Sequence, residues 1–236
     1  MQAEVSQMPA LNKYLFRYRQ FKDAKTIMKW YDIFSNFYDT SLEKLYFESR
    51  ERAVDLLELE DGLFVVDIAC GTGANFKHIM ARKHNITLFG TDYSDGMLKK
   101  AQQLIEKNKW NNTYLFQADA RRLTIPFIEQ HTKKKLGFDR VICVLGLSVI
   151  PEWERVMRNL VGLLNERGKI VIVDVFAEKR TLNTWFVEKI AKADLNRKIW
   201  QTLETLTDNF HQEYLPLKES KVGGKLFVAV GTKRKN

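Results

Sequence analysis

A glycine-rich loop directly after an apolar run is the part of the chain best suited to chemistry. Residues 64–76 read FVVDIACGTGANF, so a predicted strand leads through Asp67 to Gly71 and Gly73 before a helical segment begins. Glycines at such a place let the backbone approach a ligand closely, and the following helix offers free N–H groups. A second carboxylate, Asp92, follows the next predicted strand, where it is placed to accept the hydroxyls of a bound ribose.

Two residues of this segment indicate that the ligand is not a dinucleotide. Phe76 occupies the position that a third glycine takes in a dinucleotide-binding fingerprint. The carboxylate of Asp67 would repel a pyrophosphate and attract an ammonium or sulfonium group. The pattern therefore favours a nucleoside with a cationic substituent, and S-adenosylmethionine fits that description.

The segment DIACGTG resembles motif I of the class I S-adenosylmethionine-dependent methyltransferases, whose usual form is D/E-x-x-x-G-x-G. Four further segments resemble strand regions of this family in the same order: FGTDYSDGML, FQADARRL, FDRVICVLGLSVI and LLNERGKIVIVDV. The resemblance covers about residues 60 to 233. It implies an α/β fold with a doubly wound, mostly parallel seven-stranded sheet of order 3-2-1-4-5-7-6, in which strand 7 is antiparallel.

The resemblance also implies a set of cofactor-binding residues, which follow the first four strands. They are Asp67, Ala69, Gly71, Thr72 and Gly73; Asp92, Tyr93 and Met97; Ala118, Asp119 and Ala120; and Val144, Leu145 and Leu147. In this family pattern Asp67 faces the methionine amino group, directly or through water, and Asp92 holds the ribose. Tyr93, Met97 and the segment around Asp119 lie at the adenine, and the last three residues line the methionine side and the substrate entrance.

Each of these assignments has a structural alternative. Asp92 and Asp119 could cap turns, and Met97 could pack in a helix core with Ala101 and Leu104. Cys70 and Cys143 are predicted to be packing residues, because direct methyl transfer needs no thiolate. No metal is expected.

No residue stands out in the sequence as a general base. The four histidines are predicted to lie at the surface or to cap helices rather than to act in catalysis: His78, His84, His131 and His211. The better-placed polar groups are Tyr31, Tyr38 and Ser148, provided that the N-terminal helices cover the site. A base is required only when the acceptor must lose a proton.

The elements that would position these residues follow from the hydrophobic pattern. Short apolar runs alternate with helical periodicity, which is typical of parallel strands joined by right-handed crossovers. The predicted strands are residues 64–69, 86–91, 113–118, 140–145 and 169–176, and the clearest helices are 94–107 and 151–164. Residues 181–210 are predicted to be helical, and 213–222 and 225–231 to form a hairpin around Gly223-Gly224.

The first 60 residues differ in composition from residues 61–236, the predicted methyltransferase domain, and are predicted to form a helical cap over the substrate entrance. Residues 11–38 hold nine of the 28 aromatic side chains. Six lysines and arginines lie among the aromatics of residues 11–29, which fits an interfacial helix on an anionic membrane. A helix packed on the domain with solvated lysines explains the same pattern.

The acceptor is predicted to be small and apolar or lipid-linked. Residues 30–39 resemble a segment of methyltransferases that act on quinone precursors and phospholipid head groups, and residues 192–206 resemble lipid-amine N-methyltransferases. The fourth strand lacks the N/D-P-P-Y/F motif of enzymes that methylate nucleic-acid bases. The net charge of +9 keeps RNA methylation as an alternative, and a non-catalytic cofactor-binding subunit is another.

Composition restricts the setting of the protein. The longest apolar stretch, residues 141–150, is about half the length of a membrane span. Two cysteines are consistent with a reducing compartment. A cytoplasmic protein is therefore expected, with peripheral contact at the inner membrane face as an option, and the pattern indicates no oligomeric state.

Overall fold

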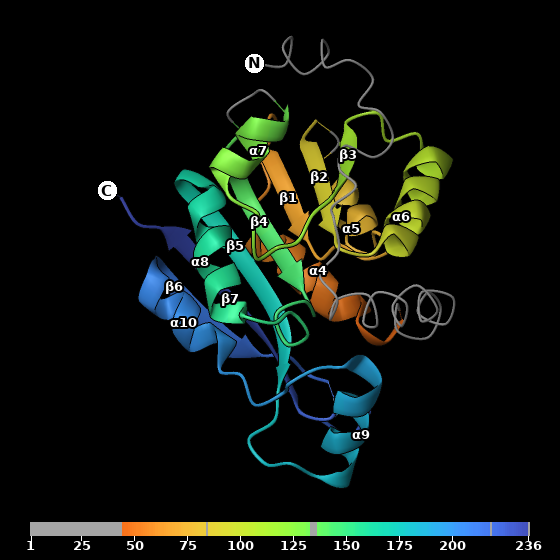
Figure 1. Ribbon diagram of the computed structural model, residues 1–236, viewed down its shortest axis with the longest axis vertical. Helices are drawn as coiled ribbons and strands as arrows, with labels where there is room; N and C mark the ends of the chain where they lie inside the picture. Colours follow the sequence, from red (N-terminus) through yellow and green to blue (C-terminus); the bar gives the residue numbers. More distant parts are fainter. Residues whose placement is uncertain (1–43, 84, 133–135, 218, 236) are drawn as a thin grey trace.

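A seven-stranded sheet of order β3-β2-β1-β4-β5-β7-β6 runs through the molecule (Figure 1). The computed structural model describes residues 44–83, 85–132, 136–217 and 219–235. Strands β1 to β5 are parallel, whereas β7 is antiparallel to both of its neighbours, β5 and β6. The predicted fold class and strand order are confirmed. The strands are β1 (Phe64–Ile68), β2 (Thr87–Asp92), β3 (Thr113–Gln117), β4 (Phe138–Val144), β5 (Leu164–Phe176), β6 (Thr207–Tyr214) and β7 (Lys225–Lys233).

Helices cover both faces of the sheet and enclose two hydrophobic clusters. The first cluster lies beneath α4 (Phe47–Leu56), α5 (Phe76–Arg82) and α6 (Asp95–Asn108). The second lies beneath α7 (Ile125–Thr132), α8 (Trp153–Leu163) and α10 (Ile199–Leu206). Successive strand residues alternate between the clusters, as Val65 and Val66 do, so the central strands must be apolar on both faces.

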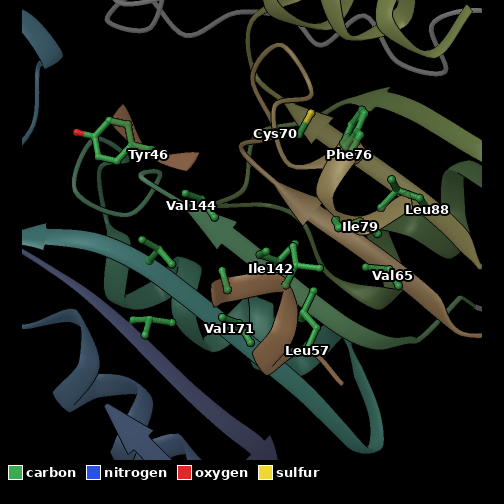
Figure 2. Packing of buried hydrophobic residues seen from close by; sticks show 14 of the residues in the cluster. Tyr46, Leu57, Val65, Cys70, Phe76, Ile79, Leu88, Ile142, Val144 and Val171 are labelled. Atoms are coloured by element: carbon green, nitrogen blue, oxygen red, sulfur yellow. The ribbon is translucent and has the colours of Figure 1, made fainter. Parts of the chain in front are cut away.

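Packing in the first cluster joins the glycine-rich loop to the sheet. Figure 2 shows Leu57, at the end of α4, next to Ile142 of β4, and Ile79 of α5 near Val65 of β1. Phe76, at the start of α5, is fully buried. A Cβ atom added at Gly73 would lie 2.7 Å from its ring, and one added at Gly90 would lie 2.5 Å away. The ring therefore occupies the close approach between loop and strand where a dinucleotide fingerprint has its third glycine.

The segment after β5 differs from its prediction. Residues 181–210 form two helices and the start of a strand: α9 (Leu182–Ala191), α10 and the first part of β6. Lys192 adopts a left-handed φ of 54° at the C-cap of α9, which separates the two helices. β6 begins at Thr207 rather than at residue 213, and residues 219–222 form the helix α11 (Glu219–Val222). An edge strand such as β6 pairs on one side only, so its mostly polar sequence TDNFHQEY carries a weak strand signal.

The described part of the predicted N-terminal cap is built into the sheet core. Helix α4 packs against β5 and β7, and Val54 and Leu57 are almost completely buried in the first cluster. The predicted membrane-binding residues 11–29 and the candidates Tyr31 and Tyr38 lie outside the described residues. Within the described ranges, every helix is too short or too polar to cross a bilayer.

Two glycine substitutions test the packing around Phe76. Gly90→Ala should lower the free energy of unfolding by about 1–3 kcal/mol, because the new methyl group would overlap the Phe76 ring and the Leu115 side chain. Gly162→Ala in α8 is the control: its Cβ would meet nothing within 4 Å, and alanine should stabilise the helix by about 0.5–1 kcal/mol. Urea denaturation of both variants measures the difference, and equal effects at the two positions would contradict the packing described.

Candidate cofactor site

The glycine-rich loop lies at the carboxyl ends of β1 and β2, where open α/β sheets bind ligands. Ala69, Gly71 and Gly73 all have positive φ, at 53°, 56° and 83°. A Cβ added at Gly71 would meet no atom within 4 Å, whereas one added at Gly73 would overlap Phe76. The first glycine therefore leaves open space above the loop for a ligand, and the second permits packing beneath it.

The carboxylate of Asp92 fastens this loop to the end of β2. One oxygen accepts a hydrogen bond from the Gly71 backbone N–H at 2.9 Å, and the other accepts one from the Ser94 N–H at 2.8 Å. The hydroxyl of Ser94 in turn accepts the Met97 N–H at 3.1 Å and caps α6. Asp92 thus joins the glycine-rich loop to the start of α6 at the end of β2.

Asp67 lies below the loop on β1 and is completely buried. Both of its oxygens accept hydrogen bonds from Asn75 Nδ2, at 3.1 and 3.0 Å. The side-chain oxygen of Asn75, Oδ1, accepts a hydrogen bond of 2.5 Å from Nη1 of Arg50, a residue of α4. Burial raises the pKa of Asp67 to about 7, although Asn75 and the nearby Arg50 charge act in the opposite direction.

Asn75 and Arg50 were not among the predicted site residues. Both side chains are buried, and they form a polar chain from α4 to the central strand. Asn75 lies two residues after Gly73, at the N-cap position of α5. Arg50 stands among apolar positions of the α4 stripe, and an arginine in such a stripe is a usable signal of a buried polar partner.

In the segment that follows β3, Asp119 forms an ion pair with Arg121. The Arg121 guanidinium donates from Nη2 to Asp119 Oδ2 at 2.6 Å and from Nε at 3.0 Å, and the Arg121 N–H also binds the carboxylate at 3.0 Å. These bonds support the turn-capping alternative and leave little acceptor capacity for an adenine amino group. Burial, together with the charge of the nearby Asp119, raises the pKa of Tyr93. Ala118 and Ala120 flank this turn.

The adenine-side candidate Met97 is buried on α6, yet the core clusters of the described residues include its neighbours Leu98 and Ala101 without it. Val144 ends β4 and is buried in the first cluster, and Leu145 follows it with a left-handed φ of 59°. Leu147 is fully buried in the second cluster, so its side chain packs in the core instead of lining an open entrance.

Ser148, the described member of the three catalytic candidates, is bound to a second buried carboxylate. Its backbone N–H donates to Asp174 Oδ2 at 2.9 Å, and its hydroxyl also binds Asp174. Burial raises the pKa of Asp174, which points to the face of the sheet opposite Asp67. Ser148 therefore ties the loop after β4 to β5. The signal for Asp174 was an aspartate inside the apolar run KIVIVDVF.

Both cysteines are buried and unpaired, as predicted, and burial raises the pKa of each thiol well above its ordinary value. The predicted surface position of His78 is wrong: its side chain, on α5, is buried and contacts Glu51 of α4 through Nδ1. Burial lowers its pKa. His211 is exposed on β6. In the described part of the chain, no three His, Cys, Asp or Glu side chains converge to hold a metal ion.

Comparison with known proteins agrees with this geometry. Residues 66–170 match the family model described as a methyltransferase domain. The chain is 28% identical over 152 residues to demethylmenaquinone methyltransferase of Desulfitobacterium hafniense, covering 64% of this chain and 56% of the relative. It is 30% identical over 144 residues to phosphatidylethanolamine N-methyltransferase of Cereibacter sphaeroides, covering 61% and 65%. The chain thus spans less than two thirds of the length of either relative.

A solved structure shows the same fold. Phosphoethanolamine N-methyltransferase 2 of Haemonchus contortus, in complex with S-adenosyl-L-methionine, superimposes with a TM-score of 0.66 at 12% identity, covering 87% of this chain and 60% of that one. Residues 66–170 therefore match a methyltransferase domain, and the fold is that of this S-adenosylmethionine-binding enzyme. Both findings agree with the predicted family, whereas the individual cofactor contacts stay predictions.

The protonation of Asp67 should be visible in the pH dependence of stability. The folded state raises this pKa from 3.8 to about 7, so between these values the folded protein binds more protons than the unfolded chain and loses stability as pH rises. Asp67→Asn removes that loss. The free energy of unfolding of the variant, relative to wild type, should therefore grow by up to about 4 kcal/mol from pH 4 to pH 7.

Denaturant titrations across this pH range provide the measurement. Comparing the variant with wild type cancels the contribution of Asp174, which has the same sign. Asp61→Asn, at an exposed turn position, is the control and should follow the wild-type profile. A constant difference between Asp67→Asn and wild type would show that Asp67 has the same pKa in both states.

Proposed function

We propose that this chain, whose residues 66–170 carry the methyltransferase domain, moves a methyl group from S-adenosylmethionine to a small apolar or lipid-linked acceptor. The observation that carries the proposal is the loop after β1. It combines open space above Gly71, a carboxylate at Asp92 anchored to the same loop, and a buried carboxylate beneath it at Asp67. These three features suit a nucleoside that carries a positive charge.

The residues present fit this cofactor. Gly71 would lie against it, because no protein atom fills the position of a Cβ there. Asp92 would accept the ribose hydroxyls from its place at the end of β2, where it also binds the backbone of the glycine-rich loop. Asp67 would act on the methionine ammonium through its charge or a bridging group, since the carboxylate itself is buried against Asn75. The backbone beside Asp119 is the candidate for the adenine edge, because Arg121 occupies the carboxylate.

When bound, S-adenosylmethionine supplies a methyl group: an acceptor lone pair forms the new bond to carbon while the carbon–sulfur bond breaks and its electrons stay on sulfur. The chain contributes orientation, which is worth about 7–11 kcal/mol in well-aligned reactions. In the described ranges, Ser148 is engaged with Asp174 and Cys70 is a buried thiol of raised pKa. Neither group is therefore suited to remove a proton, which favours an acceptor that needs little base assistance.

The names of the relatives support an apolar or lipid-linked acceptor. One is a demethylmenaquinone methyltransferase and another a phosphatidylethanolamine N-methyltransferase. The end of β4 is apolar, with Val144 and Leu145 in place of the paired polar groups that hold a flipped base. Membrane contact through residues 11–29, a cytoplasmic setting and the catalytic candidates Tyr31 and Tyr38 stay predictions.

A double-mutant cycle tests the ribose contact separately from the loop anchor. Asp92→Ala should weaken binding of S-adenosylhomocysteine by about 1.5–3 kcal/mol. If Asp92 binds the ribose, the 2′,3′-dideoxy analogue should bind wild type less tightly and the variant with little further loss, giving a coupling of about 1 kcal/mol or more. Isothermal titration calorimetry measures all four affinities.

Asp95→Ala is the matched control for this cycle, because Asp95 lies close by in sequence and pairs with Lys99 at the surface of α6. It should leave both affinities at the wild-type values. A coupling of zero at Asp92 would mean that its carboxylate holds only the protein loop.

The acceptor class can be read from labelled products. The protein is incubated with methyl-labelled S-adenosylmethionine and a cell extract, and the products are separated into lipid, RNA and aqueous fractions. We expect label in the lipid fraction. Label confined to RNA would replace the proposal with RNA methylation, and cofactor binding without label in any fraction would indicate a non-catalytic subunit.

Gly71→Asn is the control for the labelling experiment. Asparagine tolerates a left-handed φ, and its side chain would project into the space above the loop. The variant should fold and give no label. Label equal to wild type would show that the cofactor does not lie over Gly71.

A further inference from the structure

Helix α9 presents three large apolar side chains to solvent. Leu182, Trp185 and Phe186 are 89%, 48% and 57% exposed. They follow the spacing i, i+3, i+4, so they share one face of the helix. These three residues, the α9 apolar face, include the most exposed large hydrophobic side chains of the described chain. Contiguous exposed apolar surface of this kind marks a contact site for a protein or a membrane.

The opposite side of α9 is firmly attached to the domain. The Thr184 hydroxyl donates to the Gly223 carbonyl at 2.8 Å, and Val187 packs on Gly223. Glu188 is buried and accepts a bond of 2.7 Å from Arg180 Nε. The outward direction of the apolar face is therefore set by fixed contacts on the other side of the helix, and rotation of α9 would break them.

Positive charge surrounds the apolar face. Between residues 178 and 198 the chain has six Lys and Arg against three Asp and Glu. Glu188 pairs with Arg180 and Asp194 with Arg197, and the other charged residues of this segment are four lysines and Glu178. The Lys189 ammonium lies 5.7 Å from the centre of the Trp185 ring, at the end of the apolar face. Aromatic side chains with lysines at their border are typical of helices that lie in the head-group region of a membrane.

The position of α9 in the fold agrees with such a role. The helix follows the carboxyl end of β5 and projects beyond the sheet at the bottom of Figure 1. The glycine-rich loop follows β1, and the carboxyl ends of the parallel strands β1 to β5 lie at one edge of the sheet. Helix α9 follows β5, so it stands at the same edge as the candidate cofactor site. A surface that bound α9 would therefore lie at the substrate-accepting edge of the domain.

We infer that the α9 apolar face and its lysines bind the surface of an anionic phospholipid membrane. Leu182, Trp185 and Phe186 enter the boundary between head groups and acyl chains, and Lys179 and Lys189 contact lipid phosphates. The occupant is a membrane because a net positive border complements anionic head groups, whereas burial against another copy of this chain would bring the same positive charges together. This membrane contact is separate from the one predicted for residues 11–29 and does not depend on methyl transfer.

Vesicle flotation of the full chain, without cofactor, tests the apolar part of this surface. The wild type should float with phosphatidylcholine vesicles that contain about 30 mol % phosphatidylglycerol. It should bind vesicles of pure phosphatidylcholine much less. Trp185→Ala/Phe186→Ala should lower the partition coefficient about tenfold. Tyr214→Ala is the matched control, since Tyr214 is also 48% exposed and has Lys225 5.4 Å from its ring centre, and it should bind like wild type.

A second variant distinguishes a loss of membrane binding from a loss of folding. Leu182→Asn changes a side chain that is 89% exposed at the first turn of α9, so it should unfold at the wild-type temperature and still bind vesicles several-fold more weakly. Lys179→Gln/Lys189→Gln should lower binding to anionic vesicles by about fivefold for each lysine removed. Lys107→Gln/Lys109→Gln, at the far end of α6, is its control.

Three outcomes would overturn the inference. The first is wild-type binding to anionic vesicles that the α9 variants leave unchanged, which would assign any membrane contact to another part of the chain. The second is an equal loss in the Tyr214→Ala control. The third is a wild-type oligomer, seen by analytical ultracentrifugation without lipid, that the Trp185→Ala/Phe186→Ala variant dissociates. Cofactor affinity measured on the same variants should not change, so failure here is distinct from failure of the proposed activity.

Discussion

The buried carboxylate of Asp67 is the constraint around which the rest of the site is arranged. A carboxylate without partners in a protein interior is strongly disfavoured, so its surroundings must bind it or protonate it. Asn75 binds both oxygens, Arg50 binds Asn75, and burial still raises the pKa to about 7. Asn75 stands at the N-cap position of α5 and Arg50 belongs to α4, so the hydrogen bonds that satisfy Asp67 connect both helices to β1.

Two other carboxylates at the same edge of the sheet also bind loops. Asp92 binds the backbone of the glycine-rich loop, and Asp174 binds the backbone after β4. In both cases a carboxylate accepts N–H groups that would otherwise lack partners at the end of a strand. The loops that surround the candidate site are thus held by hydrogen bonds from loop backbone to strand side chains, which keeps them in place without filling the space above Gly71.

Different observations support the assignment of the fold and the proposed class of methyl acceptor. The strand order, the glycine-rich loop and the family match all describe how a cofactor can be held. The acceptor depends on whatever covers the carboxyl edge of the sheet, and one fold serves many acceptors. For this chain the features at that edge are apolar: the end of β4 at Val144 and Leu145, and the exposed face of α9. They are the reason for placing the proposed acceptor among apolar or lipid-linked molecules.

The sequence alone was sufficient for the strands, the loop and the carboxylates at the ends of β1 and β2, and its resemblance to the methyltransferase family implied the sheet order. The strands follow from the local hydrophobic pattern, and the parallel topology then brings successive strand ends to one edge. Only the tertiary structure revealed the partners of those carboxylates, because Arg50 and Asn75 are 25 residues apart and meet through packing. Only it placed β6, whose polar sequence is paired on one side, and only it exposed the α9 face, since apolar residues at helical spacing look the same whether a helix faces a core or faces solvent.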